Sequence, residues 1–187
     1  MIDPFLIFGY PRSRTKWLSE FLTTERTTCY HEPSVHWKNK DDISSFFKYR
    51  PRCGVADSGL TLLWKDVVRR IPKCKIILVE RNLEDALNSM NNLLDKHGLE
   101  CLNKNHYKQS YDKIQEIKNE IDCLVIPYES LKEENICRTV FEYCIPDEEF
   151  DSTRWVEMDK VNIQVEFESS MKIFMENKDS IRALHKE

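Results

Sequence analysis

The sequence of 187 residues lacks any apolar run that approaches the ~20 residues needed to cross a bilayer. Its beginning lacks a small-residue cleavage site and has an acidic residue before a short apolar run, so we expect no secretory signal. A net charge of −4 gives no support for general nucleic-acid binding. These absences favour a cytoplasmic protein that has neither a membrane nor a nucleic acid as its partner.

Paired cysteines and paired metal ligands are also missing. The seven cysteines are odd in number, and none of them belongs to a Cys-x-x-Cys pair. We therefore expect reduced thiols rather than a disulfide framework, and the absence of zinc-ligand spacing predicts no metal. Glycine is scarce, with only four residues, so each one is expected to mark a turn or a close approach.

The sequence does contain clear patterns in the spacing of its apolar residues. Continuous apolar runs predict buried parallel strands, and runs with helical periodicity follow them. The length favours one domain over residues 1–187. Strands that alternate with helices predict a three-layer α/β/α fold, similar to P-loop NTPases, with a central parallel sheet of about four to five strands. The segments expected to form strands are 5–9, 53–57, 75–80 and 123–127.

A basic loop with the sequence GYPRSRTKW follows the first expected strand. A loop between a strand and a helix presents unpaired backbone amides and the positive end of the helix dipole. Two hydroxyls and three positive charges add to them, so the segment predicts an anion site suited to phosphate. It is not a Walker A motif, because Arg14 and Thr15 stand where the second glycine and the lysine of that motif belong.

The loop resembles the phosphosulfate loop of sulfotransferases, whose pattern is Pro-(Lys/Arg)-Ser-Gly-Thr-(Thr)-Trp/Leu. Arg14 departs from it at the glycine, where a tight turn favours a residue that tolerates positive φ, and Lys16 departs at the second threonine. The resemblance implies that the loop binds 3′-phosphoadenosine 5′-phosphosulfate (PAPS) or adenosine 3′,5′-bisphosphate (PAP). The implied binding residues are Arg12, Ser13, Arg14, Thr15, Lys16 and Trp17.

A second motif follows the third expected strand. Sulfotransferases have the pattern Arg-Asn/Asp-Pro-x-Asp-x-x-x-Ser here, and Arg81, Asn82, Asp85 and Ser89 match it. Leu83 replaces the proline, and Asp85 is a candidate to cap or orient Arg81. The resemblance implies that Arg81 and Ser89 bind the 3′-phosphate, and a guanidinium suits phosphate because its donors are planar and bidentate. The alternative is an arginine paired with a neighbouring carboxylate.

Weaker signals accompany the two motifs. The segment YESL resembles the family's Tyr-Glu-x-Leu/Met segment, which makes Tyr128 a candidate adenine contact, with a structural tyrosine as the alternative. Ser58 stands where the family often has lysine, and the Arg-Lys-Gly element of cytosolic members is missing. Lys160 is a candidate substitute for that element. The resemblance covers roughly residues 5–135.

Sulfuryl transfer needs a base for the acceptor's proton and positive charge on the transferring group. Arg12 is the candidate for the sulfonate and the leaving oxygen. The segment YHEP supplies two candidate bases: His31 titrates near neutrality, and Glu32 needs its pKa raised by burial. We rank Glu32 first, because its offset from Arg12 resembles that of the catalytic glutamate in the protein-tyrosine branch of the family. Asp57 and His36 are weaker candidates.

The sequence therefore predicts a sulfotransferase that transfers a sulfuryl group in line from PAPS to a hydroxyl or amine acceptor. The alternatives are a P-loop kinase of a nucleotide or small molecule and a catalytically degenerate nucleotide-binding module. The acceptor is a small molecule, a peptide or a glycan, and we expect its pocket to form from segments such as 32–51 and 94–111.

Overall fold

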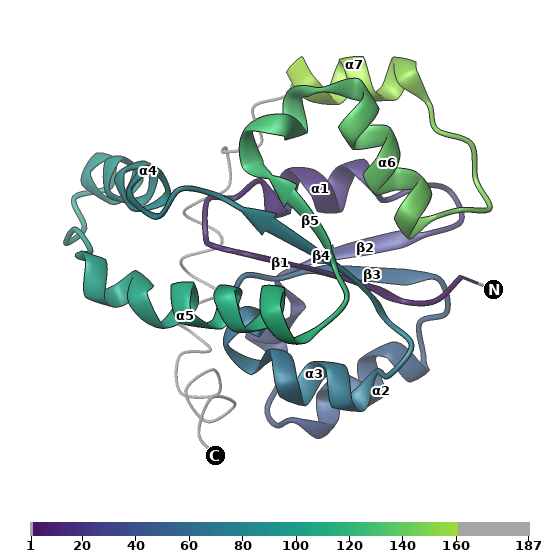
Figure 1. Ribbon diagram of the computed structural model, residues 1–187, viewed down its shortest axis with the longest axis horizontal. Helices are drawn as coiled ribbons and strands as arrows, with labels where there is room; N and C mark the ends of the chain where they lie inside the picture. The colour runs from purple at the N-terminus through teal and green to yellow at the C-terminus, as the bar shows by residue number, and fades with distance from the viewer. Residues whose placement is uncertain (1, 161–187) are drawn as a thin grey trace.

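Five parallel strands form one sheet in the computed structural model, which describes residues 2–160 (Figure 1). Their order across the sheet is β2-β3-β1-β4-β5, so the chain moves from β1 to one edge and then to the other. Ligands of such sheets bind beyond the carboxyl ends of the strands, where this direction reverses. The strands are β1 (Phe5–Gly9), β2 (Thr28–His31), β3 (Cys53–Ala56), β4 (Lys75–Glu80) and β5 (Leu124–Pro127).

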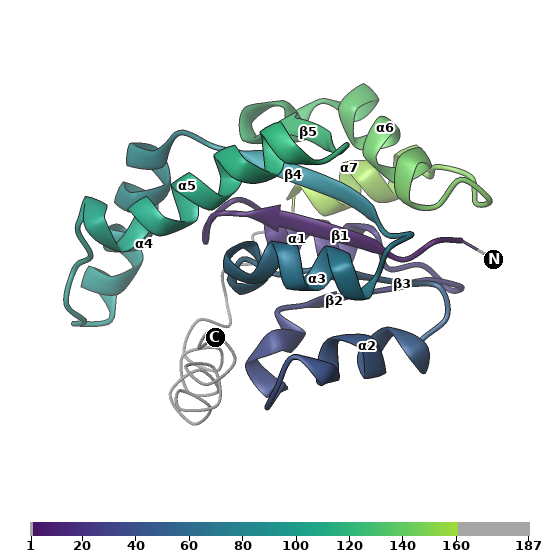
Figure 2. The same cartoon turned by 60° about the horizontal axis from the view of Figure 1, so that its bottom comes forward.

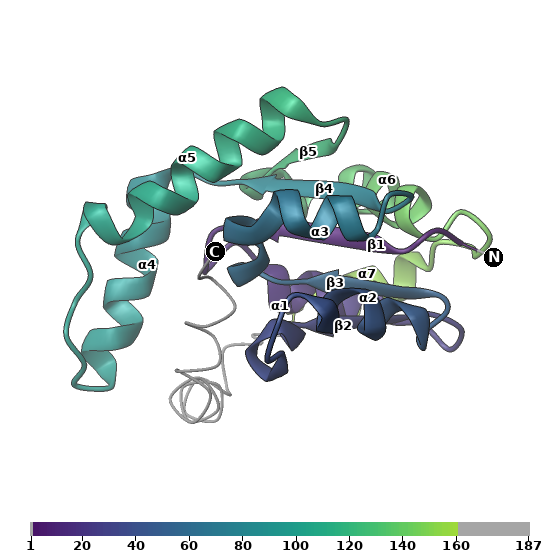
Figure 3. The ribbon, with the colours of Figure 1, turned by 90° about the horizontal axis from the view of Figure 1, so that it is seen from below.

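Helices cover both faces of the sheet and complete three layers. Helices α1, α6 and α7 lie on one face and α2, α3 and α5 on the other (Figures 1 and 2). Helices α4 and α5 form a hairpin that extends past the carboxyl edge of the sheet (Figure 3). Within residues 2–160, no helix combines the length and the apolar character that a membrane crossing requires. The helices are α1 (Thr15–Phe21), α2 (Asp41–Lys48), α3 (Trp64–Arg70), α4 (Leu83–Lys96), α5 (Lys104–Glu120), α6 (Glu134–Cys144) and α7 (Ser152–Lys160), with 3-10 helices η1 (Pro33–His36), η2 (Gly59–Leu63) and η3 (Tyr128–Lys132).

The central strand β1 separates two apolar cores. Side chains alternate between the faces of a strand, so Phe5 and Ile7 pack with α1 and α6, while Leu6 and Phe8 pack with α3 and α5. All five residues of β1 are buried, as expected for a parallel strand covered on both faces. The ring of Phe5 fills the space that a side chain at Gly54 would need, since a Cβ there would lie 1.9 Å from the ring.

The sheet confirms the expected fold class and adds one strand to the four expected segments. Strand β2 was missed because it lies at the edge of the sheet and carries no apolar run. Thr28 is exposed, and His31 is half-buried. The pairing of His31 with Ala56 aligns the ends of β2 and β3, so Glu32 follows the sheet at the same edge as the other loops.

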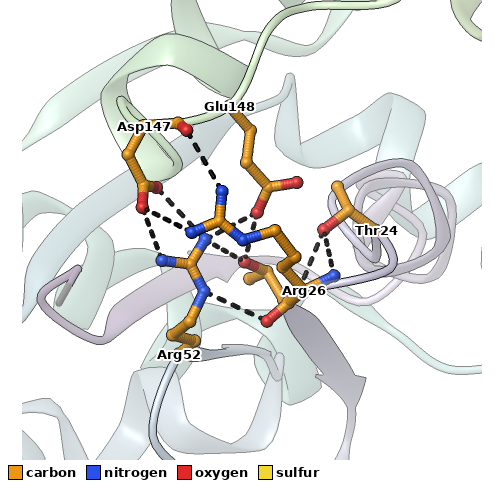
Figure 4. A network of polar contacts seen from close by, with 6 residues as sticks. Thr24, Arg26, Arg52, Asp147 and Glu148 are labelled. Atoms are coloured by element: carbon orange, nitrogen blue, oxygen red, sulfur yellow. Dashed lines mark hydrogen bonds and ion pairs between the residues drawn. The ribbon is translucent and has the colours of Figure 1, made fainter.

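An ion-pair network ties the amino ends of β2 and β3 to the turn after α6 (Figure 4). Arg52 contacts Asp147 and Glu148, each at 2.6 Å, and Arg26 reaches Asp147 at 3.4 Å. The hydrogen bond from Arg52 lowers the pKa of Asp147. Burial acts to raise the pKa of Glu148, but hydrogen bonds from threonine hydroxyls and from Arg52 outweigh it and leave that pKa lowered.

Replacing Arg52 by glutamine is expected to make folding less sensitive to acid. A carboxyl group whose pKa is lowered by folding stabilises the protein above its unfolded pKa of about 4, and this stabilisation is lost as the pH falls through the folded pKa. The free energy of unfolding of Arg52→Gln should therefore lie furthest below that of the wild type near pH 7. The difference should shrink between about pH 5 and pH 3, as measured by urea unfolding.

The matched control is Arg69→Gln. Arg69 is an exposed arginine whose partner Asp66 keeps contacts with Lys40 and Arg70. This variant should follow the wild type at every pH. A deficit of Arg52→Gln that stays constant from pH 7 to pH 3 would contradict the role given to Asp147 and Glu148.

Candidate functional site

The loop between β1 and α1 forms a tight turn at the carboxyl edge of the sheet. The Ser13 amide donates to the Tyr10 carbonyl at 3.2 Å, and Arg12 and Arg14 both have left-handed backbones, with φ of 73° and 59°. The turn that glycine would favour at position 14 is therefore made with arginine. A left-handed conformation costs a residue with a side chain about 1–2 kcal/mol, so neighbouring contacts must hold it.

The side chain of Arg14 makes those contacts. Its guanidinium donates to the Leu131 carbonyl at 3.1 Å and pairs with Asp159 of α7 at 3.8 Å. It also lies 5.5 Å from the ring centroid of Trp17 and 5.9 Å from that of Tyr128. Arg14 thus connects the loop to η3 and α7, and one of its terminal nitrogens makes both polar contacts.

Arg12, Arg81 and Ser89 meet beside this loop. The Nε of Arg12 donates to the Ser89 hydroxyl at 3.3 Å, and a terminal nitrogen of Arg81 donates to the Arg12 carbonyl. The Arg81 guanidinium lies over the Tyr128 ring, 4.0 Å from its centroid. The segments after β1, β4 and β5 therefore bring together four side chains that the motifs singled out: Arg12, Arg81, Ser89 and Tyr128.

The two guanidinium groups leave positive charge without a compensating carboxylate. Burial lowers the pKa of Arg12, and the positive charge of Arg81 lowers it further. Among the described residues, neither arginine forms an ion pair, whereas Arg14 and Lys16 do. An anion is the ligand that would relieve this repulsion.

Buried polar atoms without partners lie in the same place. The Ser13 hydroxyl and the Nε of Arg81 are buried and have no hydrogen-bond partner among the described residues. The large majority of buried side-chain polar atoms in proteins are paired, so these unpaired groups beside two arginines indicate a site for an acceptor-rich ligand. Phosphate and sulfonate oxygens meet that requirement, and the donor set therefore fits the phosphate groups of PAPS.

Helix α4 places Ser89 on the side of Arg81. Asn82 caps the helix, because its side-chain oxygen accepts from the amides of Glu84 at 2.8 Å and Asp85 at 3.2 Å. Asp85, considered as a residue that caps or orients Arg81, has an exposed side chain, and among the described residues no hydrogen bond or ion pair joins it to Arg81. The helix starts at Leu83, the position of the family's proline, so this departure leaves the helix start in place.

A second polar cluster lies at the ends of β2 and β3. Glu32 has a left-handed backbone with φ of 46°, and one of its carboxylate oxygens accepts from the Ser58 hydroxyl at 2.8 Å. His31 Nε2 lies 4.0 Å from the same oxygen and 3.4 Å from the Thr15 hydroxyl. The contact between Thr15 and His31 joins the basic loop to both candidate bases.

The environment shifts the pKa values of the two candidate bases in opposite directions. Burial lowers the pKa of His31 to about 4, against the opposing charge of Asp57, so the imidazole is neutral at pH 7. Burial raises the pKa of Glu32, and the Ser58 hydrogen bond and Lys16 oppose this shift. With 34% of its side chain exposed, Glu32 remains open to an acceptor.

Asp57 accepts hydrogen bonds from backbone amides of this cluster. One of its oxygens accepts from the amides of Gly59 and Leu60, at 2.9 and 3.1 Å, and the other accepts from the Ser34 amide at 3.1 Å. Burial raises its pKa, and so does the nearby charge of Glu32. With three amides on its oxygens and 1% of its surface exposed, Asp57 organises η1 and η2 and is poorly placed to take an acceptor's proton.

The remaining candidate residues, Trp17, Lys16 and Lys160, make packing or ion-pair contacts or lie exposed on the surface. Trp17 is buried against Phe21, and its indole N–H donates to the Met158 carbonyl at 2.8 Å. Lys16 pairs with Glu20 one helical turn away, at 3.0 Å. Lys160 is exposed at the end of α7, and it is the residues just before it that contact the basic loop.

The segments expected to line an acceptor pocket lie on two different elements. Residues 32–51 form η1 and α2, where Trp37 and Phe46 are core residues and Tyr49 is exposed. Residues 94–111 lead from the end of α4 into α5 beyond the carboxyl edge of the sheet (Figure 3). Two of the aromatic residues of the first segment, Trp37 and Phe46, therefore pack in the core, and the acceptor pocket itself stays a prediction.

Comparisons with known proteins relate this chain to sulfotransferases through its fold. The sequence matches no family model, and no curated protein matches it. The solved structures similar to it include mouse sulfotransferase SULT7A1 complexed with PAP, with a TM-score of 0.59, 16% identity, and coverage of 83% of this chain and 63% of that one. A sulfotransferase from Alicyclobacillus acidocaldarius has a TM-score of 0.56 at 14% identity, and the match covers 100% of this chain and 97% of that one. Sulfotransferase STF9 from Mycobacterium avium has a TM-score of 0.56 at 13% identity, with 96% and 77% covered. The chain thus has the sulfotransferase fold and spans less than two thirds of the mouse structure.

Proposed function

We propose that this protein is a sulfotransferase that transfers a sulfuryl group in line from PAPS to a hydroxyl or amine acceptor. The observation that carries the proposal is the convergence of Arg12, Arg81 and Ser89, with unpartnered donors beside them, at one edge of the sheet. The sulfotransferase fold supports it, and so does the presence of PAP in the mouse structure.

Each part of the nucleotide has candidate residues. Arg81 and Ser89 would hold the 3′-phosphate, while Arg12, Ser13 and the first amides of α1 would hold the phosphosulfate end. Tyr128 would contact the adenine. When bound, PAPS supplies an activated sulfuryl group whose departure leaves PAP.

The protein's own groups would perform three tasks in the transfer. Glu32 or His31 would accept the proton of the acceptor's hydroxyl or amine. Arg12 would stabilise the negative charge that develops on the leaving oxygen, because a fixed cation in a partly buried site acts more strongly than one in water. The Thr15 contact with His31 would keep the base region close to the loop.

Thermal unfolding in the presence of nucleotides tests the proposal. A ligand that binds the native state raises the melting temperature. We expect PAP to stabilise the protein without Mg²⁺, and PAPS to support transfer to at least one acceptor in a panel of phenols, alcohols, amines, peptides and glycans. Stabilisation only by ATP with Mg²⁺ would indicate a kinase instead. PAP binding without turnover on any acceptor would indicate a degenerate binding module.

Replacing Arg81 by alanine is expected to weaken PAP binding about tenfold to a hundredfold, measured by calorimetric titration. A hydrogen bond to a charged group contributes about 1.5–3 kcal/mol, and the alanine removes a bidentate donor. Arg81→Lys keeps the charge but loses the planar fork, so it should fall between alanine and the wild type. The exposed Arg69→Ala variant should bind PAP normally. Unchanged affinity in Arg81→Ala would contradict the 3′-phosphate assignment.

A further inference from the structure

Tyr107 is a buried tyrosine that neither motif contains. It lies in the first turn of α5, with 3% of its surface exposed. Its ring centroid is 6.0 Å from that of Tyr10, which directly follows β1 and begins the basic loop. This packing places the start of α5 against the same loop that carries Arg12 and Ser13.

The hydroxyl of Tyr107 is buried and has no hydrogen-bond partner among the described residues. Leaving such a group unpaired costs about 1–3 kcal/mol, and native proteins pair most of them. Within residues 2–160, the Ser13 hydroxyl and the Nε of Arg81 are unpaired as well. Thus the candidate site accounts for three of the four unpaired buried side-chain atoms in the described part of the chain.

The charges of both Arg12 and Arg81 act on the Tyr107 hydroxyl. Burial raises its pKa to about 12, while the charges of Arg12 and Arg81 act in the opposite direction. The phenol therefore stays protonated at neutral pH, and it can donate a hydrogen bond without adding charge. A donor beside two cations suits an anionic oxygen, because such a ligand accepts from all three groups.

We propose that the Tyr107 hydroxyl binds the nucleotide directly, by donating a hydrogen bond to a phosphate or sulfonate oxygen held between Arg12 and Arg81. The inference rests on the proposed function for the identity of the nucleotide, but the oxyanion chemistry follows from the unpaired donors alone. It makes α5 part of the donor site, so the helical hairpin beyond the sheet would contact the nucleotide as well as the acceptor.

The test compares Tyr107→Phe with Tyr111→Phe, the same substitution one turn further along α5, where 42% of the tyrosine is exposed. Binding of PAP and of inorganic sulfate is measured by calorimetry and thermal shift. Tyr107→Phe should bind both ligands about tenfold more weakly, the loss expected for one hydrogen bond to a charged group. Tyr111→Phe should bind them like the wild type.

Melting without ligand separates a binding role from a structural one. Removing an unpaired hydroxyl should leave the melting temperature of Tyr107→Phe equal to or above that of the wild type. A clear fall would show that the hydroxyl serves the fold and would overturn the inference. Unchanged affinity for both ligands would overturn it as well.

Two further ligands locate the oxyanion. Adenosine 3′-monophosphate carries only the 3′-phosphate, and adenosine 5′-phosphosulfate carries only the phosphosulfate end. The ligand whose affinity falls in Tyr107→Phe identifies the group that the hydroxyl contacts, and either result supports the inference. If the wild type binds sulfate through Tyr107 but not PAP, the proposed function fails while the tyrosine assignment stands. If PAP, adenosine 5′-phosphosulfate and sulfate all bind equally to Tyr107→Phe and the wild type, the tyrosine assignment fails while the proposed function stands.

Discussion

Replacing Glu32 by glutamine is expected to lower the turnover of sulfuryl transfer by about 100- to 10,000-fold, the range that general acid–base catalysis contributes. Glutamine keeps the size of the side chain and can still accept the hydrogen bond from Ser58, but it cannot take up a proton at neutral pH. PAP affinity should remain within about threefold of the wild type, because Glu32 is not among the residues proposed to donate hydrogen bonds to the phosphates. The measurement is steady-state turnover together with PAP titration.

The pH dependence of turnover identifies the base independently. Burial holds the pKa of Glu32 above its ordinary value of 4.5. As the pH decreases through this raised pKa, the carboxylate gains a proton and can no longer act as the base, so the turnover should fall at a pH above 4.5. With His31 as the base, the fall would lie near its pKa of about 4. Ser58→Ala removes a hydrogen bond that lowers the pKa of Glu32, so it should move the acid limb upward.

His31→Gln is the companion variant. It removes the imidazole beside Glu32 and Thr15, and with Glu32 as the base it should retain most of the turnover. A large loss in His31→Gln, combined with near-normal turnover in Glu32→Gln, would reverse the ranking of the two bases. Normal turnover in both variants would show that neither residue accepts the proton.

Local patterns predicted the sheet well where the strands are central, and they failed at its edge. The run FLIFG is apolar because both faces of β1 are covered, and that burial is what made the strand recognisable. The run TCYH has only Cys29 fully buried, since an edge strand packs against one neighbour, and no apolar pattern marked it. Hydrophobic periodicity therefore could not predict the strand that precedes Glu32.

The convergence of the two motifs could be predicted because loops that follow parallel strands meet at one edge of the sheet. Placing Arg81 and Ser89 near each other required only that a strand ends just before Arg81 and that a helix begins shortly after it. The contacts between Ser58 and Glu32 and between Thr15 and His31 join residues 26 and 16 positions apart, and only the packing of loops brings them together. Tyr107 gave no signal either, because a buried aromatic residue at helical spacing indicates a core.

Arg12→Ala is expected to lower turnover by about 100- to 1,000-fold, the cost of removing one donor that stabilises charge in a transition state. The effect on PAP affinity should be smaller, since PAP lacks the transferring group. The variant keeps the Arg12 carbonyl that accepts from Arg81, so the pocket proposed for the 3′-phosphate should persist. It also keeps a Cβ at a left-handed position, so the backbone cost at φ of 73° is unchanged.

The contrast between Arg12→Ala and Arg81→Ala is what tests the division of roles between the two arginines. Arg12→Ala should lose turnover with a modest change in affinity, whereas Arg81→Ala should lose affinity first. Arg12→Lys restores a charge without the guanidinium fork and should recover part of the turnover. If Arg12→Ala loses affinity as strongly as turnover, the guanidinium of Arg12 binds the ground state. Its hydrogen bond to Ser89 would then mark it as part of the 3′-phosphate pocket, and the stabilisation of the leaving oxygen would fall to the hydroxyls and amides from Ser13 to Thr15.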